Sequence, residues 1–123
     1  MKSSNRELGN YGENLACQFL EKNGYKIIER NKSFSRFCEI DIIAQIKNTL
    51  VFVEVKTRKT NSFGSPLEAI TKTKYTHIRQ GALTYLSESK NKFSNFRIDA
   101  IGITLEPKLE IKHLQNIWIL DNR

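Results

Sequence analysis

The sequence predicts an α/β fold in which helices flank a central mixed sheet of four or five strands. Three observations support this. Apolar residues recur at helical spacing over residues 5–23, two β-branched runs follow at residues 39–44 and 51–58, and a second helical stripe precedes the closing strands. With 123 residues the chain is long enough for one core and too short for two ordinary domains. We therefore expect a single domain spanning residues 1–123.

The first helix is expected over residues 5–23, and Gly24 follows it in the position where a left-handed cap favours glycine. Gly9 and Gly12 lie inside this helix, and each weakens it by roughly 1 kcal/mol relative to alanine. Their presence predicts that another group approaches the helix closely.

Connections and strands then alternate along the chain. Residues 30–37 are basic and contain serine, which favours a loop, and Lys47-Asn48 suits the turn of a hairpin. Ser65 and Pro66 form a good helix start, and a break near residues 71–73 divides the helical region that continues to about residue 89. The expected strands are residues 25–29, 39–44, 51–58, 96–104 and 109–114, followed by a core segment at residues 116–120 that contains Trp118.

Residues 51–58, V-F-V-E-V-K-T-R, form the run around which the candidate site is built. Side chains alternate along a strand, so Phe52, Glu54 and Lys56 share one face. Burying a carboxylate and an ammonium group costs free energy unless they are paired or bind something. Two interpretations are open: a solvated edge strand with a surface ion pair worth at most about 1 kcal/mol, and a site for a hard divalent cation.

The preceding strand favours the cation site. Residues 39–44, E-I-D-I-I-A, carry carboxylates at Glu39 and Asp41. In an antiparallel hairpin Asp41 and Glu54 would lie close together on one face, with Lys56 beside them. Metal-assisted phosphodiester hydrolysis needs such a set, because it requires Mg²⁺ ligands, an activated water and a cation for the developing charge. Glu39 is the alternate ligand if Asp41 faces the other way.

These motifs resemble known nuclease families. Asp41, Glu54 and Lys56 are similar to the D…E-x-K core of restriction-endonuclease-like nucleases and archaeal-type Holliday junction resolvases. The longer pattern E-I-D-I-I-A, V-F-V-E-V-K-T-R, F-G-S-P-L-E-A-I and F-R-I-D-A-I closely resembles the YraN family of bacterial proteins, over nearly the whole chain. The resemblance implies a restriction-endonuclease-like fold and a metal-dependent endodeoxyribonuclease, with branched DNA among its candidate substrates.

The expected mechanism assigns a role to each residue. Asp41 and Glu54 bind Mg²⁺ or Mn²⁺, and the Val55 carbonyl completes the coordination sphere. Lys56 positions water or stabilises the developing charge. Spacing alone favours a solvated glutamate at Glu13. The segment G-N-Y-G-E-N-L-A, however, is where the related families place a helical glutamate that reaches the metal, which implies a role for Glu13 as third acidic ligand or as ligand of bound water.

The formal net charge of +7 indicates a polyanionic partner, although many small basic proteins bind nothing in particular. We expect DNA, either structure-specific or single-stranded, and cleavage of a junction would require a symmetric homodimer. The candidates for phosphate contact are Arg36, Arg58, Lys59, Lys72 and Lys74. For Arg36, Lys72 and Lys74, a solvated surface is the alternative interpretation.

Other residues favour structural interpretations. Asp99 and Arg97 share a strand face, and an ion pair that stabilises the sheet is favoured over a catalytic role. Cys17 and Cys38 form no disulfide framework. Because no stretch has the length of a transmembrane helix or a secretory signal, we expect a soluble, cytoplasmic protein without membrane association.

A second function is open from sequence: a catalytically silent nucleic-acid-binding module that acts with a partner protein. The full E…D…E-x-K set argues against it, because a module without turnover has no need to keep buried carboxylates and a lysine together. A third, weaker interpretation is a structural partner whose basic face binds an acidic protein.

Overall fold

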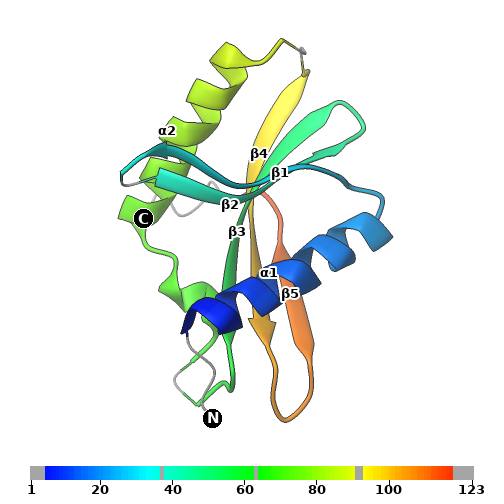
Figure 1. Cartoon of the computed structure of the whole chain (residues 1–123), viewed down its shortest axis with the longest axis vertical. Coiled ribbons are helices and arrows are strands. Elements are labelled where there is room, and N and C mark those ends of the chain that lie inside the picture. The colour runs from blue at the N-terminus through cyan, green and yellow to red at the C-terminus, as the bar shows by residue number, and fades with distance from the viewer. Residues whose placement is uncertain (1–4, 37, 63, 91–92, 118–123) are drawn as a thin grey trace.

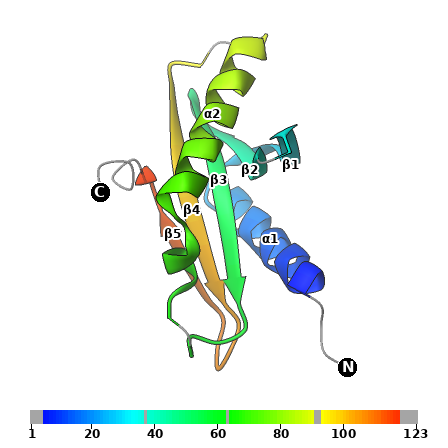
Figure 2. The same ribbon diagram turned by 90° about the vertical axis from the view of Figure 1, so that its left-hand side faces the viewer.

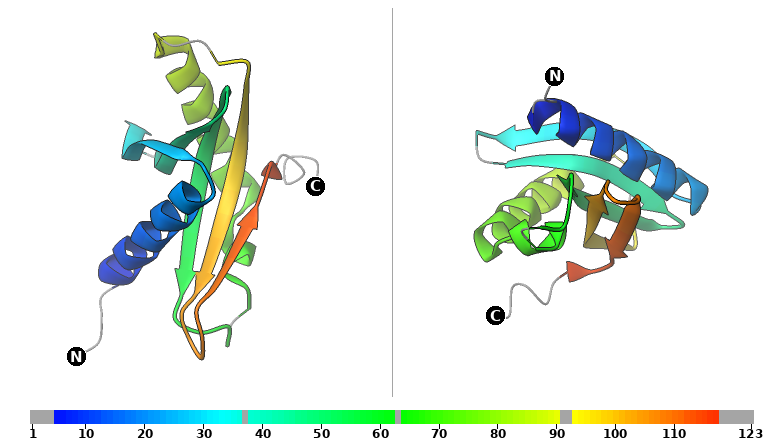
Figure 3. Two further views of the ribbon diagram at one scale, coloured as in Figure 1. Left: turned by 90° about the vertical axis from the view of Figure 1, so that its right-hand side faces the viewer. Right: turned by 90° about the horizontal axis from the view of Figure 1, so that it is seen from below.

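A five-stranded mixed sheet in the order β1-β2-β3-β4-β5 organises the structure, a computed structural model that describes residues 5–36, 38–62, 64–90 and 93–117. The α/β prediction is confirmed, and the architecture is compatible with a restriction-endonuclease-like fold. Two helices pack on opposite faces of the sheet (Figures 2 and 3). The elements are α1 (Asn5–Lys22), β1 (Lys26–Ser35), β2 (Cys38–Ile46), β3 (Thr49–Arg58), the short 3₁₀ helix η1 (Pro66–Ala69), α2 (Lys72–Glu88), β4 (Asn95–Thr104) and β5 (Glu110–Leu114).

The sheet combines one parallel pair, β3 with β4, with antiparallel pairs on either side. The chain crosses from β3 to β4 through η1 and α2, which cover one face, while α1 covers the other. Strand alternation divides the core accordingly, with Phe52 in the cluster under α2 and Val51 and Val53 in the cluster under α1. Within the described ranges, no helix combines the length and hydrophobicity needed to span a membrane.

Local signals set most element boundaries as predicted. Gly24 follows α1 with a φ of 91°, a left-handed conformation that glycine adopts readily. Lys47 has a φ of 51° in the turn between β2 and β3. Ser65 caps η1 and Thr71 caps α2, so the expected break in the second helical region is confirmed. Cys17 and Cys38 are buried free thiols.

The loop predicted at residues 30–37 is wrong over residues 30–35, because β1 continues to Ser35, and Arg36 follows in a turn. Lys32, for example, pairs with Ile40 of β2. β1 lies at the edge of the sheet and alternates between exposed and half-buried positions, so it tolerates basic and serine residues. Its composition therefore hid its secondary structure.

β2 leaves the side of β3 halfway along its length. The pairing of the two strands ends at Ile42 and Val53, whereas β3 stays paired with β4 to Arg58. Ile40 packs in the cluster under α2 and Ile42 in the cluster under α1, although residues two apart on a regular strand share a face. β2 therefore turns at Asp41, and the β1–β2 hairpin swings toward α2 (Figure 1). This turn leaves one edge of β3 without a partner strand.

Gly12 brings α1 close to the end of β3. A Cβ at this position would lie 1.8 Å from Thr57 Oγ1, so a side chain here would force the helix away. The close approach predicted from the helix glycines is confirmed at Gly12 and wrong at Gly9, where a Cβ would meet nothing within 4 Å. The next residue after Gly12 is Glu13, which is thereby placed against the sheet.

A buried carboxylate joins β4, β5 and the segment that follows. Asp99 receives hydrogen bonds from Arg97 Nε at 3.0 Å and from the Asn116 N–H at 2.9 Å, and His113 Nε2 lies 2.7 Å from its second oxygen. Burial alone would raise the pKa of Asp99, but these hydrogen bonds outweigh it and lower the pKa. The predicted ion pair with Arg97 is confirmed, while Trp118 lies outside the described residues.

Asp99→Asn is expected to lower the free energy of unfolding at pH 7 by roughly 2 to 4 kcal/mol, because it leaves Arg97 without its buried counter-charge. The native pKa of Asp99 is depressed, so its contribution is present above the unfolded pKa of about 3.9 and is lost as the pH falls through the native pKa. Urea unfolding at pH 7 and in acid measures both effects. Glu110→Gln on exposed β5 is the control, and an Asp99→Asn protein as stable as native at pH 7 would contradict this role.

Candidate active site

Asp41 and Glu54 meet where β2 parts from β3. The register of the two strands places them opposite each other, one step beyond the last pair, Ile42 and Val53. Asp41 Oδ2 accepts a hydrogen bond of 2.8 Å from the N–H of Val55. The side chain of Asp41 thus accepts a β3 backbone hydrogen bond just beyond the last backbone pair of β2 and β3, and this bond holds it beside Glu54.

The carboxyl group of Glu54 is buried with few partners that would stabilise its charged form. The residue is 3% exposed, and its buried Oε2 has no hydrogen-bond donor among the described residues. Burial and the proximity of Asp41 raise the pKa of Glu54 to about 8. Lys56 Nζ lies 3.9 Å from Oε1 and Lys74 Nζ lies 3.8 Å from Oε2, both beyond hydrogen-bond distance.

Glu13 lies near Asp41 but is paired with another residue. It is 6% exposed, and its Oε1 accepts a hydrogen bond of 3.2 Å from Arg30 Nε. Burial and then Asp41 raise the pKa of Glu13, with a partial offset from Arg30. Throughout the part of the chain that the structure describes, no three His, Cys, Asp or Glu side chains converge closely enough to hold a metal ion. The structure therefore offers a pair of carboxylates with Glu13 beside it.

The donor set of this pair suits a hard divalent cation. Mg²⁺ takes oxygen ligands and is commonly held by one or two carboxylates together with water. A buried carboxylate oxygen that lacks a donor, next to a second carboxylate, is a place where a bound cation would offset the cost of burial. The N–H and C=O of one strand residue point to the same edge, so the Val55 carbonyl faces the edge that β2 has left.

The basic candidates lie in different places. Arg58 and Lys59 line an open hollow of about 500 Å³, together with Lys56, between the end of β3 and the start of α1. Lys74 lies at Glu54. The remaining candidates are exposed: Lys72 is the first residue of α2, and Arg36 lies in the turn after β1.

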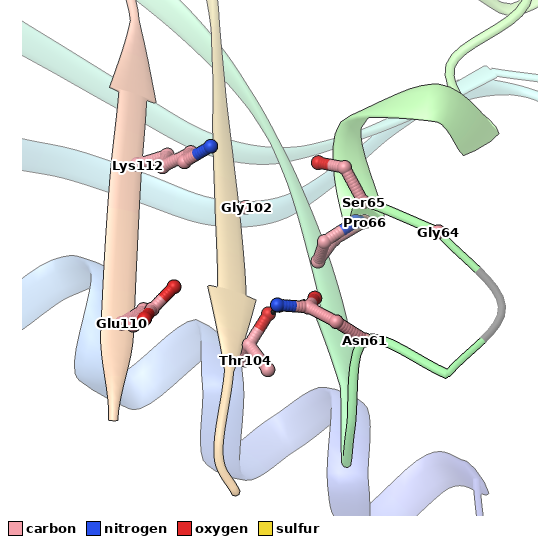
Figure 4. Close-up of a pocket in the computed structure, with 8 residues that line it drawn as sticks. All are labelled: Asn61, Gly64, Ser65, Pro66, Gly102, Thr104, Glu110 and Lys112. Atoms are coloured by element: carbon pink, nitrogen blue, oxygen red, sulfur yellow. Dashed lines mark hydrogen bonds between the residues drawn. The ribbon is translucent and has the colours of Figure 1, made fainter. Parts of the chain in front are cut away.

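A smaller hollow of about 260 Å³ lies between the segment that leads into η1 and the ends of β4 and β5. Figure 4 shows the polar side chains of Asn61, Ser65, Thr104, Glu110 and Lys112 around it. None of the predicted site residues lines this hollow, so the candidate active site is separate from it. Glu39, the alternate ligand, is exposed, and Asp41 occupies the position beside Glu54.

Two contacts of the site were missed by the sequence prediction. Arg30 was placed in a loop, yet it pairs with Glu13 from the paired part of β1. Lys74 was predicted as a phosphate contact and not as a partner of Glu54. A usable signal existed for Lys74, because lysines without any acid in the first turn of a helix oppose the helix dipole. For Arg30 there was none, since its pairing depends on how α1 packs against the sheet.

Comparison with known proteins identifies the family. Residues 12–103 match the sequence model of "Uncharacterised protein family UPF0102". A UPF0102 protein of Syntrophomonas wolfei is 43% identical over 115 residues, which cover 93% of this chain and 99% of the relative. Those of Caldicellulosiruptor saccharolyticus and Geobacter metallireducens are 45% identical over 106 residues (86% and 89%) and 41% identical over 121 residues (98% of each). The chain therefore belongs to the UPF0102 (YraN) family, which confirms the resemblance seen in its motifs.

Glu54→Gln is expected to stabilise the metal-free protein above pH 8. The native pKa of about 8 exceeds the ordinary value of 4.5, so between these values the folded state holds the extra proton and stability falls as the pH rises. Glutamine cannot ionise, so the variant should gain roughly 2 to 4 kcal/mol at pH 8.5 and little at pH 4. Urea unfolding in EDTA measures this, with Glu39→Gln as the exposed control. A loss of stability in Glu54→Gln at pH 8.5 would be the opposite result.

Proposed function

We propose that this UPF0102 protein is a metal-dependent endonuclease that hydrolyses phosphodiester bonds in DNA. One observation carries the proposal: two carboxylates lie side by side at a strand divergence, and a buried oxygen of Glu54 has no donor among the described residues. The net charge of +7 supports a polyanionic substrate. A buried, under-compensated acidic pair in a basic protein is unfavourable for stability alone, which favours a functional reason for it.

The residues of the site divide the work between them. Asp41, Glu54 and the Val55 carbonyl would hold Mg²⁺ or Mn²⁺. When bound, the metal would supply Lewis-acid chemistry that activates a water. Lys56 follows Glu54 on the same strand face and lies half-buried at the edge of the hollow, where it stabilises negative charge that develops on the phosphate.

Glu13 acts as an auxiliary acid from α1. Its carboxylate is near enough to Asp41 for the two to influence each other, and Arg30 keeps it oriented. Because Glu13 joins no three-residue ligand cluster among the residues that the structure describes, we assign it to a water bound at the site rather than to the metal itself. Its raised pKa suits a group that exchanges a proton with such a water.

The basic side chains near the site bind the DNA backbone. Arg58 and Lys59 line the hollow that also contains Lys56, so they are the expected contacts for phosphates next to the scissile bond. Lys72, at the start of α2, and Arg36, in the turn after β1, are exposed and are the expected contacts for phosphates farther from the scissile bond. Branched and single-stranded DNA are the substrates we expect, and junction cleavage would require a homodimer.

Cleavage of labelled DNA tests the proposal. We expect Mg²⁺- or Mn²⁺-dependent cutting of at least one of four substrates: four-way junction, flap, duplex and single strand. Asp41→Asn and Glu54→Gln should abolish cutting because each removes a metal ligand, and Lys56→Met should slow it by roughly 100-fold or more. Glu39→Gln, an exposed carboxylate on the same strand as Asp41, should cut normally.

The opposite result is also specific. If the native protein cuts none of the four substrates yet binds DNA in a salt-sensitive way, and the substitutions leave binding unchanged, the protein is a binding module that acts with a partner. Cutting that persists in Glu54→Gln would show that the activity comes from elsewhere.

DNA affinity should fall steeply with salt, and the double variant Arg58→Ala/Lys59→Ala should reduce the slope of log K against log [salt] by roughly 1 to 2. The physical reason is that each lost phosphate contact releases about one counterion fewer. Fluorescence anisotropy at several salt concentrations measures the slope. Lys90→Ala/Arg79→Ala removes two exposed charges elsewhere on or beyond α2 and is the matched control. An equal change in both double variants would indicate that only net charge matters.

A further inference from the structure

Lys74 is a second lysine at the carboxylate pair, outside the E-x-K motif. Its Nζ lies 3.8 Å from Oε2 of Glu54, the buried oxygen that has no hydrogen-bond donor among the described residues. Lys56 approaches the other oxygen, Oε1. The two lysines are therefore not equivalent, since only Lys74 lies at the oxygen that is left without a donor.

The start of α2 holds Lys74 in this place. Its N–H donates a hydrogen bond of 3.1 Å to Thr71 Oγ1, the helix cap, and the neighbouring Tyr75 is buried. The first turn carries Lys72 and Lys74 and no acidic residue, although the helix dipole makes this end unfavourable for cations. The carboxyl group of Glu54 faces Lys74, and in its ionised form it offsets the unfavourable interaction of the lysine with the helix dipole.

The contact between Lys74 and Glu54 is loose enough for a metal ion to replace the lysine. The distance of 3.8 Å exceeds that of a hydrogen bond, and the lysine side chain is 36% exposed. A divalent ion held by Asp41 and Glu54 would bring two positive charges to the oxygen that Lys74 faces and would repel the ammonium group. The four-carbon stem of lysine lets the group turn toward solvent.

We infer that Lys74 couples metal binding to DNA binding: it occupies the cation position at Glu54 Oε2 while the site is empty, and a bound divalent metal releases it to a DNA phosphate. The inference rests on the proposed function and assigns a regulatory step to the same site. It makes Lys74 a positioning residue whose partner alternates between Glu54 and the substrate.

The coupling is reciprocal. A metal that frees Lys74 tightens DNA binding, and DNA that engages Lys74 tightens metal binding by the same factor. The protein would then bind metal measurably on its own and more tightly once DNA is bound.

Mn²⁺ titration of the full chain tests the competition. Isothermal titration at pH 8.5 compares native protein with Lys74→Met and with Arg79→Met, which removes an exposed charge from the same helix. Without its competitor, Lys74→Met should bind Mn²⁺ about three- to tenfold more tightly, whereas Arg79→Met should stay within about twofold.

DNA affinity tests the release. Anisotropy of a labelled single-stranded oligonucleotide is measured with and without Ca²⁺, a hard cation for oxygen ligands, and the oligonucleotide is checked for intactness afterwards. Ca²⁺ should tighten binding to native protein and Arg79→Met by about threefold or more, and binding to Lys74→Met by less than about 1.5-fold.

The outcomes separate the inference from the proposed function. If native protein binds Mn²⁺ and Lys74→Met binds it no more tightly, the inference is overturned while the metal site stands. If Ca²⁺ tightens DNA binding to Lys74→Met as much as to native protein, the coupling is overturned and the metal site again stands. Failure of the native protein to bind Mn²⁺ overturns both the inference and the proposed function.

Discussion

The structure depends on one electrostatic constraint: two carboxyl groups, Asp41 and buried Glu54, are held side by side where they cannot both ionise without a cost in stability. If β2 and β3 could separate further at this point, the repulsion between Asp41 and Glu54 would be relieved. Such separation is prevented because Asp41 is hydrogen-bonded to the Val55 N–H, and because β3 is fixed by β4 along its whole length. The protein thus keeps an arrangement that costs stability in the absence of a cation.

The rest of the fold supplies the stability that offsets the cost of this carboxyl pair. Apolar clusters on both faces of the sheet bury β3 and β4, and the Asp99 network ties β4 to β5 and to the segment after it. Gly12 lets α1 settle against the end of β3, which brings Glu13 to the same region from the opposite face. α2 closes the other face and supplies Lys74. The helices and strands that place the site residues therefore also form the packed core that stabilises the protein against the cost of the carboxyl pair.

The sequence was sufficient for the parts of this account that depend on local pattern. Alternation placed Glu54 and Lys56 on one strand face, and the hairpin turn at Lys47 brought Asp41 opposite Glu54. What depends on tertiary packing was not predictable in this way. The sequence E-I-D-I-I-A contains no glycine or proline that would signal the turn of β2 at Asp41. The edge strand β1 is polar and basic, so its composition resembled that of a loop. The pairing of Arg30 with Glu13 arises only when α1 lies across the sheet.

Anomalous diffraction from crystals grown or soaked with Mn²⁺ would test the central claim most directly, because it locates the metal independently of any activity. The account predicts an anomalous peak between Asp41 and Glu54, at about 2.0 to 2.3 Å from an oxygen of each, and no peak in Glu54→Gln crystals treated in the same way. Crystals of the native protein that show Mn²⁺ only at other places, or none under conditions that support DNA binding, would contradict it.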